Sequence, residues 1–254
     1  MRRRSTRIVS VLGAVAAALL LIAPAASATF HLMKIREISP GTDGQDDSYV
    51  EVQMFAGLQN FLSGGAALKV CDPDCAPITT LSPFTDVAHG NSQDTVVFGD
   101  TGVPSGSMDF TVDNLNLDQI KGGGAVCYQG ELGSNDCVSW GNFTASSTLT
   151  GLYGTSGSTG NPAPALTSGM ALRRSIAAGC PTLLESSDDT NDSAADFQAA
   201  TQNPRPNSVT PTETPCGPTG GGGPTAPASA TPKKKKCKKA KKRAAAAKKC
   251  KKRR

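Results

Sequence analysis

The feature that most constrains this chain is an alternation of apolar and polar residues with a period of two, in short runs between turn-forming residues. Residues 49–55 and 108–113 show it most clearly. Apart from one or two turns around 116–121, no segment of ten residues has a helical period, so the pattern predicts antiparallel strands. Further strands are expected at 33–38, 67–70, 95–98, 126–129, 138–140 and 170–176. Seven or eight short strands with Gly- and Ser-rich connections predict an all-β fold, a β-sandwich over residues 29–207 with 144–168 as a long rim loop.

Cysteine spacing indicates a domain closed by disulfides. Six of the eight cysteines lie between residues 71 and 216, and the other two lie near the C-terminus. Eight cysteines allow 105 connectivities, so any pairing rests on proximity along the chain. Neither the CX3C nor the CX9C spacing matches a CX2C zinc knuckle, and both histidines are distant, which disfavours zinc. The pairs favoured by proximity are Cys71 with Cys75, Cys127 with Cys137, and Cys180 with Cys216.

Residues 1–28 have the pattern of a cleaved secretory signal peptide. Four arginines precede an apolar run over 8–22, and Ala26-Ser27-Ala28 follows as a small-x-small cleavage site. An uncleaved membrane anchor is the alternative, but spanning a bilayer takes about 20 apolar residues and this run is shorter. Export by the general route is favoured over the twin-arginine route. We therefore expect a secreted protein with no transmembrane helix after cleavage.

The C-terminal region changes composition after residue 207. Residues 208–232 are rich in Pro, Gly and Thr and have almost nothing to bury, which predicts a disordered linker. Residues 233–254 follow with 15 basic and no acidic side chains, and repeat the motif Lys-Cys-Lys-Lys. Such a block repels itself and stays solvated unless an anion neutralises it. The predicted polyanion-binding residues are Lys233, Lys234, Lys235, Lys236, Lys238, Lys239, Lys241, Lys242, Arg243, Lys248, Lys249, Lys251, Lys252, Arg253 and Arg254.

Charge is segregated along the chain in a way that the total of +5 conceals. Residues 29–232 carry 7 basic and 21 acidic side chains, a difference of −14, and the tail carries +15. Outside the cell the polyanions available to such a tail are cell-wall polymers, acidic polysaccharides and anionic lipid surfaces. Because no aromatic residue follows position 198, sequence-specific nucleic-acid recognition is not expected. The alternatives are a tail that only solubilises the protein or one that folds onto its own acidic body.

Motifs for catalysis are absent from the sequence. It contains no G-x-S-x-G, no phosphate-binding Gly-Lys-Ser/Thr loop, no G-x-G-x-x-G and no H-E-x-x-H. The histidines, His31 and His89, have the setting of surface residues. Glu37 and Glu51 lie on what we predict to be the first two strands and are expected to pair, although such carboxylates are more often structural than a glycosidase pair. The sequence therefore favours a protein that is not an enzyme.

An acidic run at residues 188–196 is the most distinctive local motif. Asp189, Asn191 and Ser193 alternate as calcium-loop ligands do, and Asp196 is a further oxygen donor. The Gly and the terminal Glu of an EF-hand are missing, and Asp and Asn also serve widely as turn caps. The calcium hypothesis, with Asp189, Asn191 and Asp196 as ligands, stays open beside the capping interpretation. No other cofactor is expected.

Short motifs at both ends of the body follow the pattern of a known family. The first are Ile-Arg-Glu-Ile at 35–38 and Ser-Tyr-Val-Glu-Val at 48–52. The last are Leu-Arg-Arg at 172–174, Thr-Asn-Asp-Ser-Ala-Ala-Asp-Phe at 190–197 and Pro-Arg-Pro-Asn at 204–207. In these motifs the body resembles the lamin tail domain as it occurs in secreted bacterial proteins. Arg36 stands where the family has Asn. The resemblance implies an immunoglobulin-like β-sandwich used as a binding or structural module, with Glu37 and Glu51 in structural roles.

Together these patterns predict an exported, disulfide-closed, lamin-tail-like module held at the cell envelope by its polycationic tail. One alternative is an extracellular Ca2+-dependent hydrolase that uses the acidic run at 188–196. Another is a carbohydrate-binding adhesin that recognises its ligand through the Gly/Ser loop or that run. The expected organisation is a signal peptide at 1–28, a sandwich at 29–207, a linker at 208–232 and a basic tail at 233–254.

Overall fold

The computed structural model describes residues 31–130, 135–145, 149 and 158–216. All of them belong to one compact unit. The predicted signal peptide, part of the rim loop, residues 217–232 of the expected linker and the basic tail lie outside the described residues.

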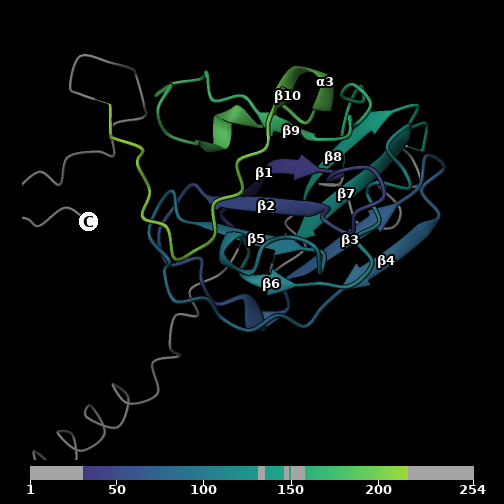
Figure 1. Ribbon diagram of the computed structural model, residues 1–254. Coiled ribbons are helices and arrows are strands. Elements are labelled where there is room, and N and C mark those ends of the chain that lie inside the picture. Colours follow the sequence, from purple (N-terminus) through teal and green to yellow (C-terminus); the bar gives the residue numbers. More distant parts are fainter. Residues whose placement is uncertain (1–30, 131–134, 146–148, 150–157, 217–254) are drawn as a thin grey trace, which may run out of the picture. The chain divides into compact units, whose positions relative to one another are not determined.

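The described part of the chain is an all-β protein with two sheets and very little helix (Figure 1). The larger sheet has the order β10-β9-β1-β2-β5-β6, and the smaller one has the order β4-β3-β7-β8. Neighbouring strands are antiparallel except β5 and β6. The strands are β1 (Met33–Ser39), β2 (Tyr49–Met54), β3 (Ala67–Cys71), β4 (Pro77–Leu81), β5 (Thr95–Gly99), β6 (Phe110–Thr111), β7 (Gly123–Gln129), β8 (Asn135–Gly141), β9 (Met170–Arg174) and β10 (Phe197–Thr201).

Helical structure in the described residues is limited to single turns. The 3-10 turns are η1 (Leu62–Gly64), η2 (Ser105–Ser107) and η4 (Ser186–Asp188), and the one short α-helix is α3 (Ser193–Asp196). Asp192 caps α3 by accepting from the backbone N–H of Ala194 at 3.1 Å, as a polar side chain before a helix does. No helix of the described residues is long and apolar enough to cross a membrane.

The period-two pattern located eight of the ten strands. The run at 108–113 forms only the two-residue β6, because the Asp109 carboxylate, rather than a backbone carbonyl, accepts the N–H of Val97 at 2.8 Å. The pattern did not predict the other two strands, β4 and β10. β4 lies at the edge of its sheet with mostly exposed side chains, so it has no apolar face to repeat. β10 contributes little more than Phe197 to the core, and its other side chains are exposed or only partly buried.

The hydrophobic core lies between the two sheets. One sheet contributes Ile35, Val52 and Phe98, and the other contributes Val126 and Trp140, all with no exposed surface. Each of these positions belongs to an alternating series whose other members face outward, which is why a period of two predicted the layer. Trp140 also donates its indole N–H to the carbonyl of Ile120 at 2.8 Å, so its one polar atom is satisfied inside the core.

A bulge in β1 determines which of its side chains lie on the outer face of the larger sheet. Ile35 pairs with Val52 and Glu37 pairs with Glu51, so Arg36 is an extra residue with no partner position on β2. A bulge changes the direction of the side chains beside it. Both Arg36 and Glu37 consequently line the same cavity on the outer face of the sheet.

Residues 202–216, which we call the strap, cross that outer face. Asn203 binds Glu37 of β1, Arg205 binds Glu51 of β2, and Asn207 binds Asp109 just before β6. Figure 1 shows the strap as the yellow-green segment that leaves β10, passes β1, β2 and β5, and then turns back. The returning part is fixed at its end by the disulfide between Cys180 and Cys216. The folded body therefore continues beyond residue 207, to Cys216 at least.

Candidate functional site: the strap pocket

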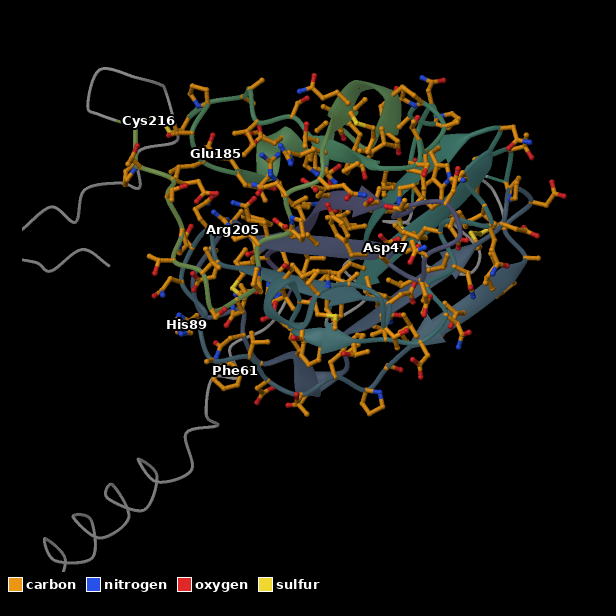
Figure 2. The ribbon with its side chains drawn as sticks, in the orientation of Figure 1. Asp47, Phe61, His89, Glu185, Arg205 and Cys216 are labelled. Atoms are coloured by element: carbon orange, nitrogen blue, oxygen red, sulfur yellow. A yellow bond between two sulfur atoms is a disulfide. The ribbon has the colours of Figure 1, made fainter. Side chains whose placement is uncertain are left out.

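A cavity of about 480 Å³ lies between the strap and the outer face of the larger sheet. Its size falls within the range of small-molecule binding sites. We call it the strap pocket. Figure 2 labels Arg205 on the strap where it passes the strands, and Cys216 at the end of the strap. The charged and amide side chains that line the pocket are Arg36, Glu37, Glu51, Gln53, Arg173, Asn203, Arg205 and Glu213.

Glu37 and Glu51 face each other across β1 and β2 on the floor of this pocket, which confirms their predicted pairing. Glu37 is 1% exposed and Glu51 is 3% exposed. Glu37 accepts from the Tyr49 hydroxyl, from Arg173 Nε and, at 2.9 Å, from the backbone N–H of Asn203. Glu51 accepts the backbone N–H of Arg205 at 2.8 Å. Both carboxylates thus fasten the strap to the sheet.

The two paired carboxyl groups differ in what stabilises their charge. Glu37 accepts hydrogen bonds from the guanidinium of Arg173 and from two other donors. Burial raises the pKa of Glu51 to about 8, and the negative charge of Glu37 acts in the same direction, while the N–H of Arg205 opposes it. At neutral pH the Glu51 side chain is therefore mostly protonated.

Three arginines line the pocket, and two of them are committed to the fold. Arg205 donates to Glu213 Oε2 at 2.7 Å, to the carbonyl of Gln93 at 2.7 Å and to Thr95 Oγ1 at 3.3 Å. Arg173 donates to Glu37 and, at 2.6 Å, to the carbonyl of Thr201. Within the described residues, the guanidinium of Arg36 donates only to the carbonyl of Arg174.

A second cavity of about 510 Å³ adjoins the strap pocket and shares Arg36, Arg173, Thr212 and Glu213 with it. Its other lining side chains include Ser175, Thr182 and Gln198. Five of the seven basic residues in the described part of the chain lie on β1, β9 or the strap, in a body whose formal charge is strongly negative. Four of these five, all except Lys34, line one or both cavities, together with Glu37, Glu51 and Glu213.

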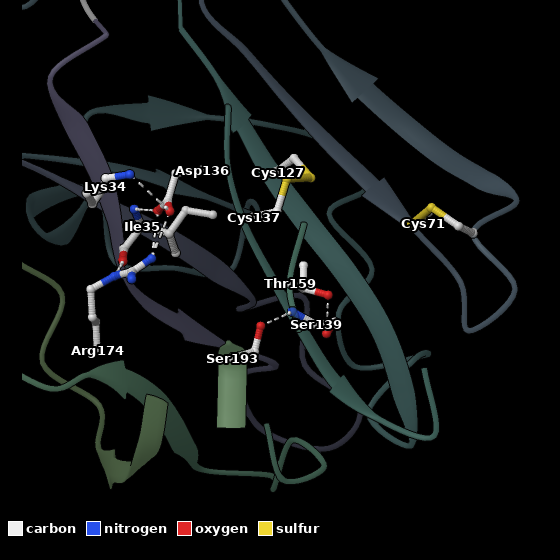
Figure 3. The surroundings of a disulfide bond; sticks show 11 residues. Lys34, Ile35, Cys71, Cys127, Asp136, Cys137, Ser139, Thr159, Arg174 and Ser193 are labelled. Atoms are coloured by element: carbon white, nitrogen blue, oxygen red, sulfur yellow. Dashed lines mark hydrogen bonds and ion pairs between the residues drawn. A yellow bond between two sulfur atoms is a disulfide. The ribbon is translucent and has the colours of Figure 1, made fainter. Parts of the chain in front are cut away.

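The acidic run at 188–196 surrounds a different arginine. Arg174 has a side chain that is 0% exposed, and it holds Asp136 of β8 through two hydrogen bonds of 2.8 and 2.9 Å. Its Nη1 also lies 3.2 Å from Asp189 and 3.3 Å from Asp196. Figure 3 shows Arg174, Lys34 and Asp136 converging beside the Cys127–Cys137 disulfide. This cluster joins the two sheets, because Arg174 lies on β9 and Asp136 on β8.

Asp189 and Asp196, two of the predicted calcium ligands, are thus brought together, with the third, Asn191, in the turn between them. Asn191 has a left-handed backbone with φ 56°, and its N–H donates to Asp189 Oδ1 at 3.1 Å. Although burial opposes it, the positive charges of Arg174 and Lys34 hold the pKa of Asp189 well below its usual range. Among the described residues no group of three or more acidic, His or Cys side chains is placed to hold a metal ion. Calcium ligation stays a prediction, and it would have to compete with a guanidinium already in place.

The three cysteine pairs favoured by proximity are at disulfide distance. The Cα atoms are 4.6 Å apart in Cys71–Cys75, 4.1 Å in Cys127–Cys137 and 5.6 Å in Cys180–Cys216. Three disulfides suggest an oxidising environment. The first closes a tight turn, the second joins neighbouring positions of β7 and β8, and the third anchors the strap.

The remaining predicted site residues lie apart from the strap pocket. The backbone of His89 exchanges hydrogen bonds with the Asn207 side chain at 2.8 and 2.9 Å, so this residue anchors the strap through its main chain. Nδ1 of His31 is buried without a hydrogen-bond partner in the described part of the chain. The basic residues of the tail, 233–254, lie outside the described residues.

Of the polar pocket residues, the sequence considered only Glu37 and Glu51 for a functional role and gave none to the others, among them Arg36, Gln53 and Arg205. Arg36 belongs to a bulge, which a strict period of two does not reveal, and its only signal was that the lamin tail family has Asn there. Gln53 continues the outward-facing series of β2, next to Val52 and Met54 in the core. Arg205 lies in a Pro-rich segment with no periodicity at all. Comparisons with protein-family models, with curated proteins and with solved structures give no match to this chain.

Proposed function

We propose that the protein is a secreted, non-catalytic binding or structural module that is retained at the cell envelope by its polycationic tail. In this proposal the all-β body is an immunoglobulin-like β-sandwich of the lamin tail type, and the tail binds an anionic cell-wall polymer, polysaccharide or lipid surface. Disulfides and the secretory signal pattern support an extracellular location.

The observation that carries the non-catalytic part is the use made of the acidic side chains. Glu37 and Glu51 hold the backbone of the strap. Asp189 and Asp196 surround the buried guanidinium of Arg174. A carboxylate that accepts from backbone amides or from a buried arginine contributes to the stability of the fold. This favours a structural or binding module over a hydrolase.

The retention part rests on the charge separation in the sequence. Fifteen basic and no acidic side chains follow residue 232, after a body with 7 basic and 21 acidic side chains. A block of this kind binds polyanions through many weak contacts, and each contact weakens as salt screens it. Retention should therefore depend on ionic strength rather than on any single residue.

The experiment compares cells that export the full chain, a chain lacking 233–254, and a matched chain in which every Lys and Arg of 233–254 is replaced by Gln. Fractions are prepared at low salt and in about 1 M NaCl, where the Debye length is only about 3 Å. We expect the full chain in the envelope fraction at low salt and in the medium at high salt. Both altered chains should be found in the medium under either condition. Envelope retention of the truncated chain at low salt would contradict the proposal.

A further inference from the structure

We propose that the strap pocket binds a small hydroxylated oxyanion, with Arg36 receiving its carboxylate or phosphate group and Gln53 accepting from one of its hydroxyls. This goes beyond retention by the tail, since the site lies on the folded body.

The first support is the state of the Arg36 side chain. A guanidinium has five N–H donors, and among the described residues that of Arg36 uses one contact, to the carbonyl of Arg174. It is partly buried at the wall shared by the two cavities. Burial lowers the pKa of Arg36, because the charge has lost part of its water. An anion in the cavity would restore that stabilisation through paired, charge-assisted hydrogen bonds.

The second support is that the acidic groups near Arg36 are occupied elsewhere. Glu37 accepts from Arg173, Tyr49 and the backbone of Asn203. Glu213 accepts from Arg205 on one oxygen and from Gln53 on the other. Glu51, with its pKa raised to about 8, is mostly neutral at pH 7. Arg36 is thus the arginine of the lining that makes no close ion pair within the described residues, although the charges of Glu51, Glu37 and Glu213 act on it from a distance.

The third support is independent of the first two. The lining of the strap pocket also contains a buried acceptor that has no donor. Gln53 has no exposed surface and lines the strap pocket, yet its Oε1 has no hydrogen-bond partner in the described part of the chain. The amide orientation is fixed, because Nε2 donates to two acceptors, Gln93 Oε1 at 2.9 Å and Glu213 Oε1 at 3.0 Å. A buried acceptor without a donor costs about 1–3 kcal/mol, and a ligand hydroxyl would satisfy it.

An unpaired cation and an unpaired acceptor in one cavity require a ligand that carries both an oxyanion and a hydroxyl. Sugar acids and sugar phosphates have this combination. Inorganic anions lack the hydroxylated frame and neutral sugars lack the charge. The approximate volume of 480 Å³ accommodates one such ring and excludes a folded macromolecule.

The test uses the full chain at a constant ionic strength of about 0.15 M, where exposed charges of the tail are screened beyond about 8 Å. Glucuronate and glucose 6-phosphate are titrated as probes of the carboxylate and phosphate sources, with glucose as the neutral control. Binding is followed by the melting temperature and by the Nε–H NMR signals of the arginines. The signal that disappears in Arg36→Gln identifies Arg36.

We expect at least one of the two anionic sugars to raise the melting temperature and move the Arg36 signal, and glucose to do neither. Arg36→Gln should weaken binding about tenfold or more, and Arg36→Lys, which keeps the charge without the planar fork, should weaken it less. Lys121→Gln is the matched control, because it also removes one positive charge from the body but lies outside both cavities. It should bind as the unaltered chain does.

Two results would overturn the inference. One is that neither anionic sugar changes the melting temperature or the Arg36 signal. The other is that Arg36→Gln binds as tightly as Lys121→Gln, which would show that Arg36 does not receive the anion. Salt-dependent retention of Arg36→Gln at the envelope is expected to be normal, so failure of this site and failure of the tail proposal give different results.

Discussion

Arg174 is the residue on which the joining of the two sheets depends most. It has no exposed side-chain surface, and it neutralises Asp136 while approaching Asp189 and Asp196. Its guanidinium also lies 4.7 Å from the ring centroid of Phe197, and its Nε donates to the carbonyl of Ile35 at 2.8 Å. These contacts come from both sheets and from the acidic run, so losing one side chain disturbs all three.

We expect Arg174→Met to lower the free energy of unfolding by about 3–5 kcal/mol, because buried carboxylates lose the charge that compensates them. Arg174→Lys should recover part of the loss, since it keeps the charge but not the two-pronged geometry. Urea denaturation measures both. Lys121→Met breaks an exposed pair with Asp43 and serves as the control, with no measurable change expected. A loss at Arg174 no larger than the one at Lys121 would contradict the cluster's structural role.

Glu51 makes stability depend on pH in a direction opposite to that of most carboxylates. Its folded pKa of about 8 lies above the ordinary value of 4.5, mainly because of burial. The folded protein therefore binds this proton more tightly than the unfolded chain. Its contribution to stability is complete below pH 4.5 and is lost as the pH rises towards 8, with a slope of at most about 1.4 kcal/mol per pH unit.

Glu51→Gln removes the titrating group and keeps an oxygen to accept the N–H of Arg205. We expect the variant to lose the decline in stability between pH 5 and 8 and to be more stable than the unaltered chain at pH 8. Chemical denaturation at a series of pH values measures this. Asp189, whose pKa is lowered, contributes in the opposite sense at acid pH, and it is common to both proteins. Parallel pH curves for the two would show that Glu51 titrates normally.

At the scale of elements, the strap determines how the outer face of the larger sheet is covered. It binds β1 and β2 through its backbone amides and β5 through the side-chain amide of Asn207, without a strand ladder. Asn207 alone binds Asp109, His89 and Thr95. Because the strap has no regular structure of its own, it depends on the Cys180–Cys216 disulfide to hold its returning end.

Replacing both Cys180 and Cys216 by Ser should cost more stability than replacing Cys71 and Cys75. The sequence separations are 36 and 4 residues. Closing the longer loop restrains the unfolded chain by roughly 4 kcal/mol and the shorter one by roughly 2 kcal/mol on the chain-entropy model. The first double variant should also show faster amide exchange at Asn203 and Arg205. An equal cost in the two variants, with protected strap amides, would mean that the strap holds without its disulfide.

The strands and the strap differ in how far the sequence predicts them, and the reason is physical. β1 and β2 have apolar side chains on the core face and mostly polar side chains on the face that the strap covers, so alternation marks them although β2 is buried on both faces. The strap is held by side chains that lie far away in sequence, and nothing within residues 202–216 records those partners. The pairing of Glu37 with Glu51 follows from the order of the strands, whereas the bulge that adds Arg36 to the pocket depends on a register shift.

The acidic run predicts either calcium ligands or turn caps, and its spacing does not predict the guanidinium that lies among its carboxylates. Asp189 and Asp196 alternate with turn residues in a way that suits calcium and a guanidinium equally well. The residue that indicates the cluster lies on β9. Leu172 faces the core, and Arg174, two residues further along the strand, must face the same way. An arginine on the inner face of a strand requires buried carboxylates, so Arg174 together with the run would have indicated the cluster.

At the scale of the whole molecule, segregation of charge matters more than its sum. Residues 29–254 carry 22 basic and 21 acidic side chains, a formal charge of +1. A protein with these charges mixed evenly would bind weakly to any charged surface. Here the acidic groups precede residue 232 and 15 basic groups follow it. The body is therefore attracted to positively charged surfaces and the tail to negatively charged ones.

We expect the chain from residue 29 onward to bind both cation- and anion-exchange resins at pH 7 and low salt. Removing 233–254 should abolish binding to the cation exchanger and strengthen binding to the anion exchanger, because −14 remains. Replacing the Lys and Arg residues of the tail with Gln should have the same effect at unchanged length, which separates charge from chain length. Binding of the truncated chain to the cation exchanger would place the basic surface on the body, at Arg36 and Arg173. Elution of the longer chain should move to lower salt as each basic residue is removed, since every contact with the resin releases counterions.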